Sequence, residues 1–362
     1  MSWTQKTLGE IVNLKRGFDL PSSCRVDGPY PVFSSSGQTG THSEAAVKGP
    51  CVITGRYGTI GQVFYSDAAC WPLNTSLYST EFKGNDPKFV YYLLKTLPWR
   101  DYLTASAVPG INRNHVHLCP VCVPDYETQT AISGVLGSLD NKIELNTKLN
   151  GYLEELADGM FRRHFGGLTD NATLADFANV TMGQSPAGCS YNEAGIGTIF
   201  YQGRAEFGWR YPTQRLSTTE PKRMAKAGDV LMSVRAPVGD LNLAYEDCCI
   251  GRGLAAIHCD YPSYGLYLMR SLHKKLDAYN GEGTVFGSIN GKALNGLPIA
   301  LPNNAAIRAF EKEAAPIDTQ IRNNEVESQA LVTLRDALLP KMMSGEIDVS
   351  KVDLTQLNSH LA

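Results

Sequence analysis

Two copies of one helical pattern decide the fold of this chain: Leu139-Asp140-Asn141-Lys142-Ile143-Glu144-Leu145-Asn146 and, 178 positions later, Ile317-Asp318-Thr319-Gln320-Ile321-Arg322-Asn323-Asn324. The same offset relates Pro120 to Pro298, so the repeat extends back into the sequence before each helix. A repeat of this length corresponds to a domain rather than to a solenoid unit. We therefore expect two similar halves related by pseudo-two-fold symmetry.

The composition of the 362 residues is that of a globular protein with at least two cores, since 43% of them are hydrophobic and 34 are glycine. No apolar run approaches the roughly 20 residues that a membrane span requires, and the first residues lack the apolar core of a signal peptide. Nine cysteines with irregular spacing fit reduced thiols better than a disulfide framework. We therefore expect a cytoplasmic protein without membrane contacts.

The net charge of −3 differs from that of a typical lone nucleic-acid binder. Phosphate contacts favour an excess of Lys and Arg, which this chain lacks. If the protein binds DNA, local patches or partner proteins must supply much of the positive field.

Each half begins with glycine-rich and aromatic-rich sequence and ends with a long helical pattern. The runs 51–56 and 230–235 are β-prone, lie beside glycine-containing turns, and end in Arg56 and Arg235. Shorter helical runs follow at 89–94 and 264–272. The predicted fold class is therefore α+β, with two tandem mixed α/β domains.

The apolar positions of the long helical patterns predict a coiled-coil seam. From Ile132 to Met160 they advance by three or four residues and average 3.5. Because Asn146 and Asn324 recur at matching sites, and a buried seam asparagine fixes register, we expect the two helices to pack antiparallel on each other. Pro316 is expected to kink or start the second helix. The alternative is two amphipathic helices on separate cores. The predicted seam residues are Ile143, Asn146, Leu153, Leu156, Ile321, Asn324, Leu331 and Leu334.

These helical segments resemble a known family. Residues 123–132, 139–146 and 153–157 resemble the first spacer region of the specificity subunits of type I restriction–modification systems. The segment Leu334-Arg335-Asp336-Ala337-Leu338-Leu339-Pro340-Lys341-Met342 resembles the end of their second spacer. The resemblance covers essentially the whole chain. It implies target-recognition domains at 1–124 and 167–302, antiparallel spacer helices at 125–166 and 303–345, and a C-terminal tail at 346–362.

The resemblance also implies a function. A subunit of this family carries no catalysis and recognises double-stranded DNA at a bipartite site, one half-site for each domain. Two modification (methyltransferase) subunits are expected to dock on the chain, and restriction subunits to join the larger complex. No cofactor is expected in this chain, because S-adenosylmethionine, ATP and Mg²⁺ would bind the partner subunits.

The residues themselves contain no recognisable enzymatic motif. An Asn-Pro-Pro-aromatic motif for amine methylation is absent, and 287–292 falls one residue short of a phosphate-binding loop. His115, His117, Cys119 and Cys122 could in principle hold zinc. The second copy has no possible metal ligand at any of the four matching positions, so we predict no metal site.

Candidate DNA contacts lie in polar, glycine-rich loops. Arginine suits guanine, asparagine and glutamine suit adenine, and other polar groups hold phosphates. The candidates are Arg16, Ser35, Gln38, Arg56, Tyr57, Asn112, Arg113, Gln184, Gln202, Arg204, Arg235, Arg252, Asn290 and Lys292. Arg56 and Arg235 are the best candidates for phosphate contacts because they recur at matching strand ends, and Gln202 and Arg204 are better candidates for base reading. Solvated loops remain an alternative, and a capping Arg or a turn-closing Asn would also recur.

Two other functions remain open at this stage. A scaffold that pairs methyltransferase subunits would leave the target site unchanged when loops 34–39 or 202–204 are exchanged. A self-sufficient methyltransferase would have to bind and use a methyl donor without any partner.

Overall fold

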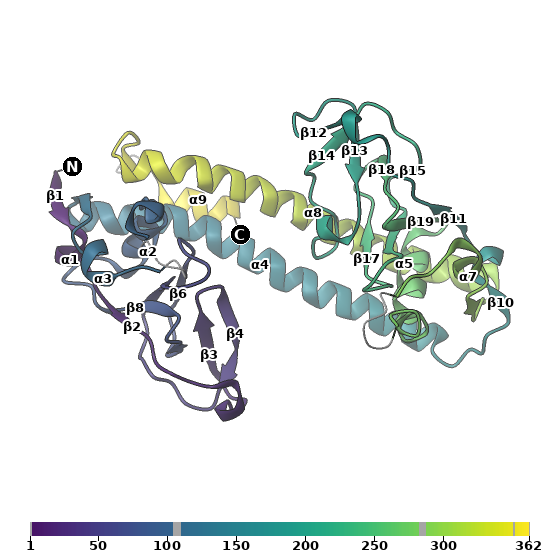
Figure 1. The fold of residues 1–362 in the computed structure, drawn as a ribbon, viewed down its shortest axis with the longest axis horizontal. Helices are drawn as coiled ribbons and strands as arrows, with labels where there is room; N and C mark the ends of the chain where they lie inside the picture. The colour runs from purple at the N-terminus through teal and green to yellow at the C-terminus, as the bar shows by residue number, and fades with distance from the viewer. Residues whose placement is uncertain (1, 104–109, 282–286, 350–351, 362) are drawn as a thin grey trace. The chain divides into compact units, whose positions relative to one another are not determined.

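The computed structural model describes residues 2–103, 110–281, 287–349 and 352–361. The chain forms two compact units, one of Met1–Thr147 with Val326–Ala362 and the other of Lys148–Glu325. Each unit contains a mixed globule and part of two long helices, α4 (Tyr126–Phe165) and α8 (Asn304–Met343) (Figure 1). The expected α+β class with two long helices is confirmed.

The first globule contains sheets in the orders β2-β8-β5-β6 and β4-β3-β7, and the pair β1-β9. Its strands are β1 (Trp3–Thr7), β2 (Asn13–Arg16), β3 (Tyr30–Ser34), β4 (Gly37–His42), β5 (Cys51–Gly55), β6 (Val63–Ser66), β7 (Trp71–Pro72), β8 (Ser76–Glu81) and β9 (Pro120–Pro124). Its helices are α1 (Leu8–Ile11), α2 (Pro87–Lys95) and α3 (Arg113–Val116).

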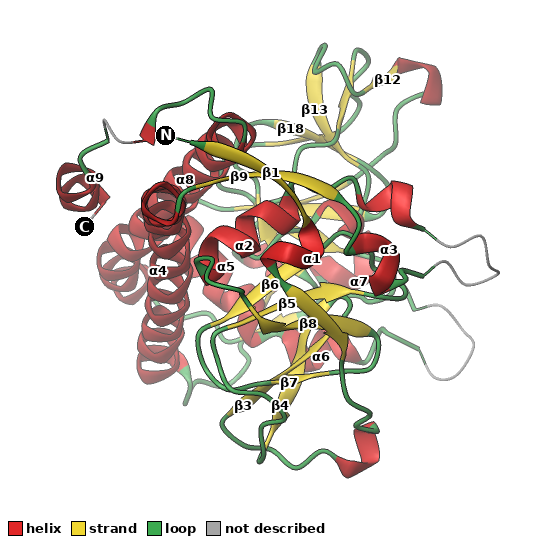
Figure 2. Ribbon diagram, turned by 90° about the vertical axis from the view of Figure 1, so that its left-hand side faces the viewer, coloured by secondary structure: helices red, strands yellow, loops and turns green. Residues whose placement is uncertain are grey.

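The alternation of side chains along β5 explains the layers of this globule. Val52 belongs to the same core as Phe89 of α2, whereas Cys51 and Ile53 pack with Phe33 of β3. Figure 2 shows α1 and α2 on one side of the four-stranded sheet and β3, β4 and β7 on the other. The four-stranded sheet is therefore the middle layer.

The second globule repeats this arrangement with sheets in the orders β11-β19-β16-β17 and β12-β14-β13-β18-β15, and the pair β10-β20. Its strands are β10 (Ala172–Thr173), β11 (Asn179–Met182), β12 (Tyr191–Asn192), β13 (Thr198–Tyr201), β14 (Leu216–Thr218), β15 (Met224–Ala225), β16 (Val230–Ser233), β17 (Leu241–Leu243), β18 (Cys248–Ile250), β19 (Leu254–His258) and β20 (Pro298–Ile299). Its helices are α5 (Pro262–Ser271), α6 (His273–Asp277) and α7 (Gly291–Asn295). On β16, Met232 packs with Tyr264 of α5, while Leu231 packs with Tyr201 on the other face.

Backbone hydrogen bonds show which residues of the two globules correspond. The N–H of Ile111 donates to the carbonyl of Arg56 at 2.9 Å, and the N–H of Ile289 donates to the carbonyl of Val234 at 3.0 Å. Both residues of the first bond are thus displaced by 178 in the second. Val234, not Arg235, corresponds to Arg56, so the prediction that the two arginines occupy matching strand ends is wrong by one residue. On an extended strand that shift turns the side chain to the other face.

Each long helix begins with a capping side chain at repeat-related positions. The carboxylate of Asp125 accepts the N–H of Thr128 at 2.9 Å, and Asn303 accepts the N–H of Ala306 at 2.9 Å. The backbone hydrogen bond to Asp125 lowers the pKa of its carboxyl group. A side-chain cap of this kind satisfies a backbone N–H at the start of the helix and so stabilises that end. The second helix therefore starts before Pro316, which lies inside α8.

A carboxylate links the start of each shorter helix, α2 or α5, to a long helix, but it comes from a different element in each half. Asp86 caps α2 and accepts a hydrogen bond from Ser133 of α4 at 2.5 Å. Tyr261 precedes α5, and Glu311 of α8, the repeat counterpart of Ser133, accepts the N–H of Tyr264 at 2.9 Å. Burial raises the pKa of the Glu311 carboxyl group. The carboxylate at the start of the short helix is therefore Asp86 of the short helix in the first half and Glu311 of the long helix in the second.

The long helices run antiparallel in both units. In the first unit Arg335 of α8 donates to Asp140 of α4 at 2.7 Å, and Asn146 donates to Glu327 at 2.7 Å. Residue numbers rise along α4 as they fall along α8, so the helices point in opposite directions. In the second unit, Asn324 donates to Asn150 at 2.7 Å. The predicted antiparallel packing is confirmed.

The buried stripe of α4 departs from the predicted heptad. Its buried positions include Leu139, Asn146, Asn150, Ala157 and Phe161, which advance by about 3.67 residues per turn, close to the 3.6 of a straight helix. Asn146, Ile321, Asn324 and Leu331 are buried as predicted, and Ile143 and Leu153 are half-buried.

Two of the predicted seam positions are wrong. Leu156 is 53% exposed and Leu334 is 47% exposed. A stripe of apolar residues with a period of 3.5 residues gradually rotates around a helix that has 3.6 residues per turn. The predicted stripe therefore faces away from the partner helix after Asn146 on α4 and after Leu331 on α8.

The C-terminal segment belongs to the first unit. Val349 is buried in the first globule's core, and Val352 and Leu357 of the segment that includes α9 (Leu354–Leu361) pack against that core. No helix in the described part of the chain is long and apolar enough to cross a membrane.

Candidate DNA interface

Five of the predicted DNA contacts line one cavity in the first globule. Arg16, Arg56, Tyr57, Asn112 and Arg113 surround a cavity of about 330 Å³ that is also lined by Leu77, Gly110 and Ile111. None of the described residues that line it is acidic. The cavity therefore presents concentrated positive charge on a chain whose net charge is −3.

The cavity forms where three parts of the fold end together. β2 ends at Arg16, β5 ends just before Arg56, and α3 starts at Arg113. Arg16 has an ion pair with Asp19 at 3.3 Å, but both side chains are more than half exposed. An exposed pair of this kind contributes little, so phosphate can replace Asp19 as the partner of Arg16.

Arg56 and Tyr57 form one wall of the cavity. The Cζ atom of Arg56 lies 4.5 Å from the centroid of the Tyr57 ring, which is the geometry of a cation–π contact. A Cβ atom on Gly110 would lie 2.3 Å from the Tyr57 ring, so glycine is required there. Sequence reasoning missed Gly110, because nothing in the sequence shows that Tyr57 packs against it.

The other two candidates of the first globule lie on the β3–β4 hairpin. The hydroxyl of Ser35 is 3.4 Å from the place of a Cβ on Gly58, so Ser35 lies beside the turn that contains Tyr57. Gln38 pairs with Phe33 in the hairpin and is exposed, but it does not line the cavity.

Three loops meet in the second globule and carry Gln184, Gln202 and Arg252. The N–H of Gln184 donates to the carbonyl of Ile250 at 2.9 Å, and the N–H of Arg252 donates to the Ser185 hydroxyl at 3.3 Å. The glycines beside Arg252 pack against the backbone of Gln202. All three candidate side chains are exposed, so they form one polar surface.

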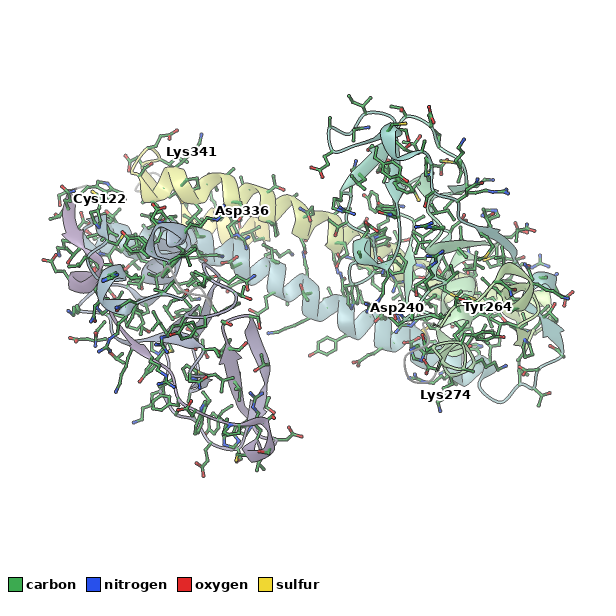
Figure 3. All side chains as sticks on the ribbon, viewed as in Figure 1. Cys122, Asp240, Tyr264, Lys274, Asp336 and Lys341 are labelled. Atoms are coloured by element: carbon green, nitrogen blue, oxygen red, sulfur yellow. The ribbon has the colours of Figure 1, made fainter. Side chains whose placement is uncertain are left out.

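Arg204 lies near this surface but has a carboxylate partner. Its guanidinium donates to Asp240, and the two residues line a cavity of about 470 Å³ with Phe207, Gly208 and Asn242. Figure 3 labels Asp240 in the second unit. Base reading by Arg204 would require this ion pair to open or to turn.

The recurring asparagines have a structural role that the sequence left open. The side-chain oxygen of Asn112 accepts the N–H of Asn114 at 3.0 Å, and that of Asn290 accepts the N–H of Ala293 at 2.9 Å. Both therefore close the turn at a helix start. Each side-chain oxygen therefore already accepts one backbone N–H, which limits how the side chain can turn toward a base.

The two globules present different chemistry at equivalent places. The position of Arg56 is taken by Val234, which is 3% exposed, and the position of Tyr57 by Arg235, which is exposed. Gly291 replaces Arg113, and the cation there is the neighbouring Lys292, which is exposed. The second globule thus lacks the three-arginine arrangement of the first.

Sequence reasoning also missed Trp209. Its side chain is 50% exposed although tryptophan is usually well buried. The neighbouring Gly208 is held on both sides, since its N–H donates to Asn242 at 3.1 Å and its carbonyl accepts from Asn242 at 3.0 Å. A tryptophan between a glycine and an arginine in a polar loop was the available signal.

The possible zinc ligands are used elsewhere or lie apart. Nε2 of His117 accepts the N–H of Leu14 at 3.0 Å, and burial lowers the pKa of this imidazole. Cys119 is buried, whereas Cys122 is exposed on β9. Among the residues that the structure describes, no three His, Cys, Asp or Glu side chains gather as metal ligands.

Comparison with known proteins identifies the family. Residues 1–155 match the family model described as type I restriction modification DNA specificity domain. The putative type I restriction enzyme MjaX specificity subunit of Methanocaldococcus jannaschii is 30% identical to this chain, over 73% of the chain and 69% of the relative. The chain belongs to the specificity subunits of type I restriction–modification systems.

Other specificity subunits match along nearly the whole chain. The type I restriction enzyme HindI specificity subunit of Haemophilus influenzae is 21% identical over 95% of this chain and 99% of the relative. The crystal structure of the type I restriction–modification system S subunit from M. genitalium superposes with a TM-score of 0.65 at 17% identity, covering 94% of this chain and 96% of that one. The latter supports the two-globule fold, and the family resemblance read from the sequence is confirmed.

We predict that Arg56→Ala weakens DNA binding by similar factors for cognate and non-cognate duplexes. Removal of one phosphate contact should also reduce the salt slope, the dependence of log K on log salt concentration, by about 0.9. Titration of the assembled complex at several salt concentrations measures this slope. Arg100→Ala is the control, since Arg100 is exposed in the same globule but does not line the cavity. An unchanged slope in Arg56→Ala would remove Arg56 from the interface.

Proposed function

We propose that this specificity subunit reads a bipartite duplex site without catalysing any reaction itself. Residues 1–124 would read one half-site and residues 167–302 the other, with contacts from the predicted residues. Modification subunits would bind S-adenosylmethionine and methylate adenine after flipping it out of the stack. ATP and Mg²⁺ would act on the restriction subunits, and the complex would work in the cytoplasm.

The observation that carries this proposal is the arginine cavity of the first globule. Three guanidinium groups converge there, none of the described lining residues is acidic, and the chain as a whole is slightly acidic. Local concentration of cations on such a chain is the pattern that phosphate binding requires. The different residues at the equivalent places of the second globule support two unlike half-sites.

The proposed spacer is the pair α4 and α8. Each helix has 40 residues. At 1.5 Å per residue such a helix is about 60 Å long. We propose that the length of the pair sets the number of unread base pairs between the half-sites.

The proposed docking surface for a modification subunit is an apolar stripe on α4. Leu149, Tyr152 and Leu156 are 39%, 68% and 53% exposed and lie on one side of the helix at spacings of three and four. The heptad pattern predicts Leu156 in the seam with α8, but its side chain is exposed. Because an exposed leucine and tyrosine stripe on a helix fits the apolar face of another helix, we assign it to a partner helix.

We predict that Leu156→Glu weakens association with the modification subunit at least tenfold, because a carboxylate would have to be buried in the apolar contact. Thr147→Glu adds the same charge on the same helix outside the stripe and should leave association unchanged. Sedimentation of mixtures with the modification subunit measures both. Equal behaviour of the two variants would place the partner elsewhere.

We also predict the effect of lengthening the helix pair. Duplication of residues 139–145 together with residues 329–335 adds two turns, or about 10.5 Å, to both antiparallel helices. The unread spacer should grow by about 3 base pairs at 3.4 Å each, while both half-site sequences stay the same. Sequencing of methylated DNA from cells that carry the variant measures both features. An unchanged spacer contradicts the proposed spacing role, and duplication in one helix alone is the control for loss of register.

The two alternatives give different results in simple assays. A scaffold that does not read DNA predicts an unchanged target when loops 34–39 or 202–204 are exchanged. A self-sufficient methyltransferase predicts methyl-donor binding by the purified chain. The arginine cavity favours the proposed specificity role over both.

A further inference from the structure

A repeated aspartate attaches each globule to the long helices. The hydroxyl of Tyr92 in α2 donates to Asp140 of α4 at 2.6 Å, and the hydroxyl of Tyr267 in α5 donates to Asp318 of α8 at 2.9 Å. Burial, together with the nearby carboxylate, raises the pKa of both hydroxyls, so they remain donors. Asp140 and Asp318 are repeat counterparts with the same kind of partner.

The arginine that donates to this aspartate comes from a different structural element in each unit. In the first unit Arg335 comes from α8 and donates to Asp140 at 2.7 Å. The repeat counterpart of Arg335 is Ala157, which is fully buried and cannot form an ion pair. In the second unit the arginine that donates to Asp318 is Arg210, from the loop between β13 and β14. An arginine of the globule has replaced an arginine of the helix.

Arg210 bridges both helices of the second unit. Its Nη1 atom donates to Glu154 of α4 at 3.3 Å, its Nη2 atom donates to Asp318 of α8, and its side chain is 3% exposed. The guanidinium also lies 6.0 Å from the centroid of the Tyr267 ring. A planar fork with several donors can hold two carboxylates at once, which a lysine ammonium on a flexible stem does less well.

The loop between β13 and β14, which contains Arg210, also carries Gln202 and Arg204. The buried carboxylate of Glu206 shapes its first turn, since it accepts the N–H of Gly203 at 3.0 Å and a hydrogen bond from Arg215 at 2.8 Å. The contacts of Gly208 with Asn242 fix its middle. The part of the loop before Arg210 is therefore held by hydrogen bonds, and Arg210 attaches it to the long helices.

We propose that Arg210 is a positioning residue for DNA reading by the second domain. It ties the loop of Gln202 and Arg204 to Glu154 and Asp318, so that the loop keeps one place relative to the helix pair of its unit. The proposal rests on the proposed function, since it needs residues 167–302 to read a half-site. In the described part of the first domain, the arginine beside Asp140 is Arg335, which belongs to α8 and lies outside every loop that we assign to DNA reading.

The test uses Arg210→Lys in the complete complex with its modification subunits. Methylation rates are measured on the cognate duplex and on duplexes with one base-pair substitution in either half-site. Each substitution normally costs about 5- to 150-fold. Arg210→Lys should reduce this discrimination about threefold in the half-site of the second domain and leave the other unchanged. Exchange of residues 167–302 for those of another specificity subunit identifies which half-site that is.

Controls separate positioning from general damage. Arg335→Lys removes the corresponding arginine of the first unit and should leave discrimination at both half-sites unchanged. The chain has four tryptophans, so the contribution of Trp209 to acrylamide quenching is taken as the difference from a matched Trp209→Phe chain, and this contribution should increase in Arg210→Lys. Should Arg210→Lys fail to fold, Tyr267→Phe, which removes one hydrogen bond to Asp318, should give a smaller loss confined to the same half-site.

The outcomes distinguish this proposal from the proposed function. If the wild-type complex has no split target, the proposed function fails. If the wild type has a split target but the variants discriminate normally, or lose discrimination equally in both half-sites, the positioning role of Arg210 is overturned.

Discussion

The structure depends on buried amide groups between two antiparallel helices. In the second unit Asn150 and Asn324 are 1% and 4% exposed and are joined at 2.7 Å, and Asn150 also donates to Glu325 at 3.0 Å. A buried amide without partners is costly, so registers that separate these residues are disfavoured. In the first unit Asn146, 2% exposed, is held by Glu327 in the same way. The register of the helices is therefore fixed by polar contacts, while apolar contacts supply the bulk of the attraction.

The register of the long helices determines where each globule is attached. Asp140 of α4 accepts a hydrogen bond from Tyr92 of α2, and Asp318 of α8 accepts one from Tyr267 of α5. Those short helices cover one face of a four-stranded sheet, and the loops at the sheet edge carry the candidate DNA contacts. Two buried tyrosines thus connect the helix register to the placement of the loops that carry the candidate DNA contacts.

The repeat made much of this predictable. The offset of 178 predicted the two halves and the antiparallel helix pair, because two segments with similar sequences form similar local structures. The sequence did not predict which residues of α4 face α8 after Asn146. Two neighbouring stripes of residues on α4 fit a helix contact, and the sequence alone does not distinguish them. Leu149 and Leu156 belong to the exposed stripe, whereas Asn150 and Ala157 belong to the buried one.

The candidate site shows a similar division between what the sequence reveals and what it hides. Five residues predicted from loop chemistry meet in one cavity, because strand ends and helix starts gather at one edge of a sheet. The predicted match of Arg56 with Arg235 is wrong, because the backbone hydrogen bonds of Ile111 and Ile289 make Val234 the counterpart of Arg56. Arg210 gave no sequence signal, since its two carboxylate partners are more than 50 positions away in each direction.

We propose that this chain determines where its complex modifies DNA. Single-molecule sequencing of methylated adenine, in cells that express the modification subunit with and without this chain, tests this role. We expect a split motif with a constant gap that disappears when the chain is deleted. A motif that persists unchanged without the chain would show that another protein determines the target.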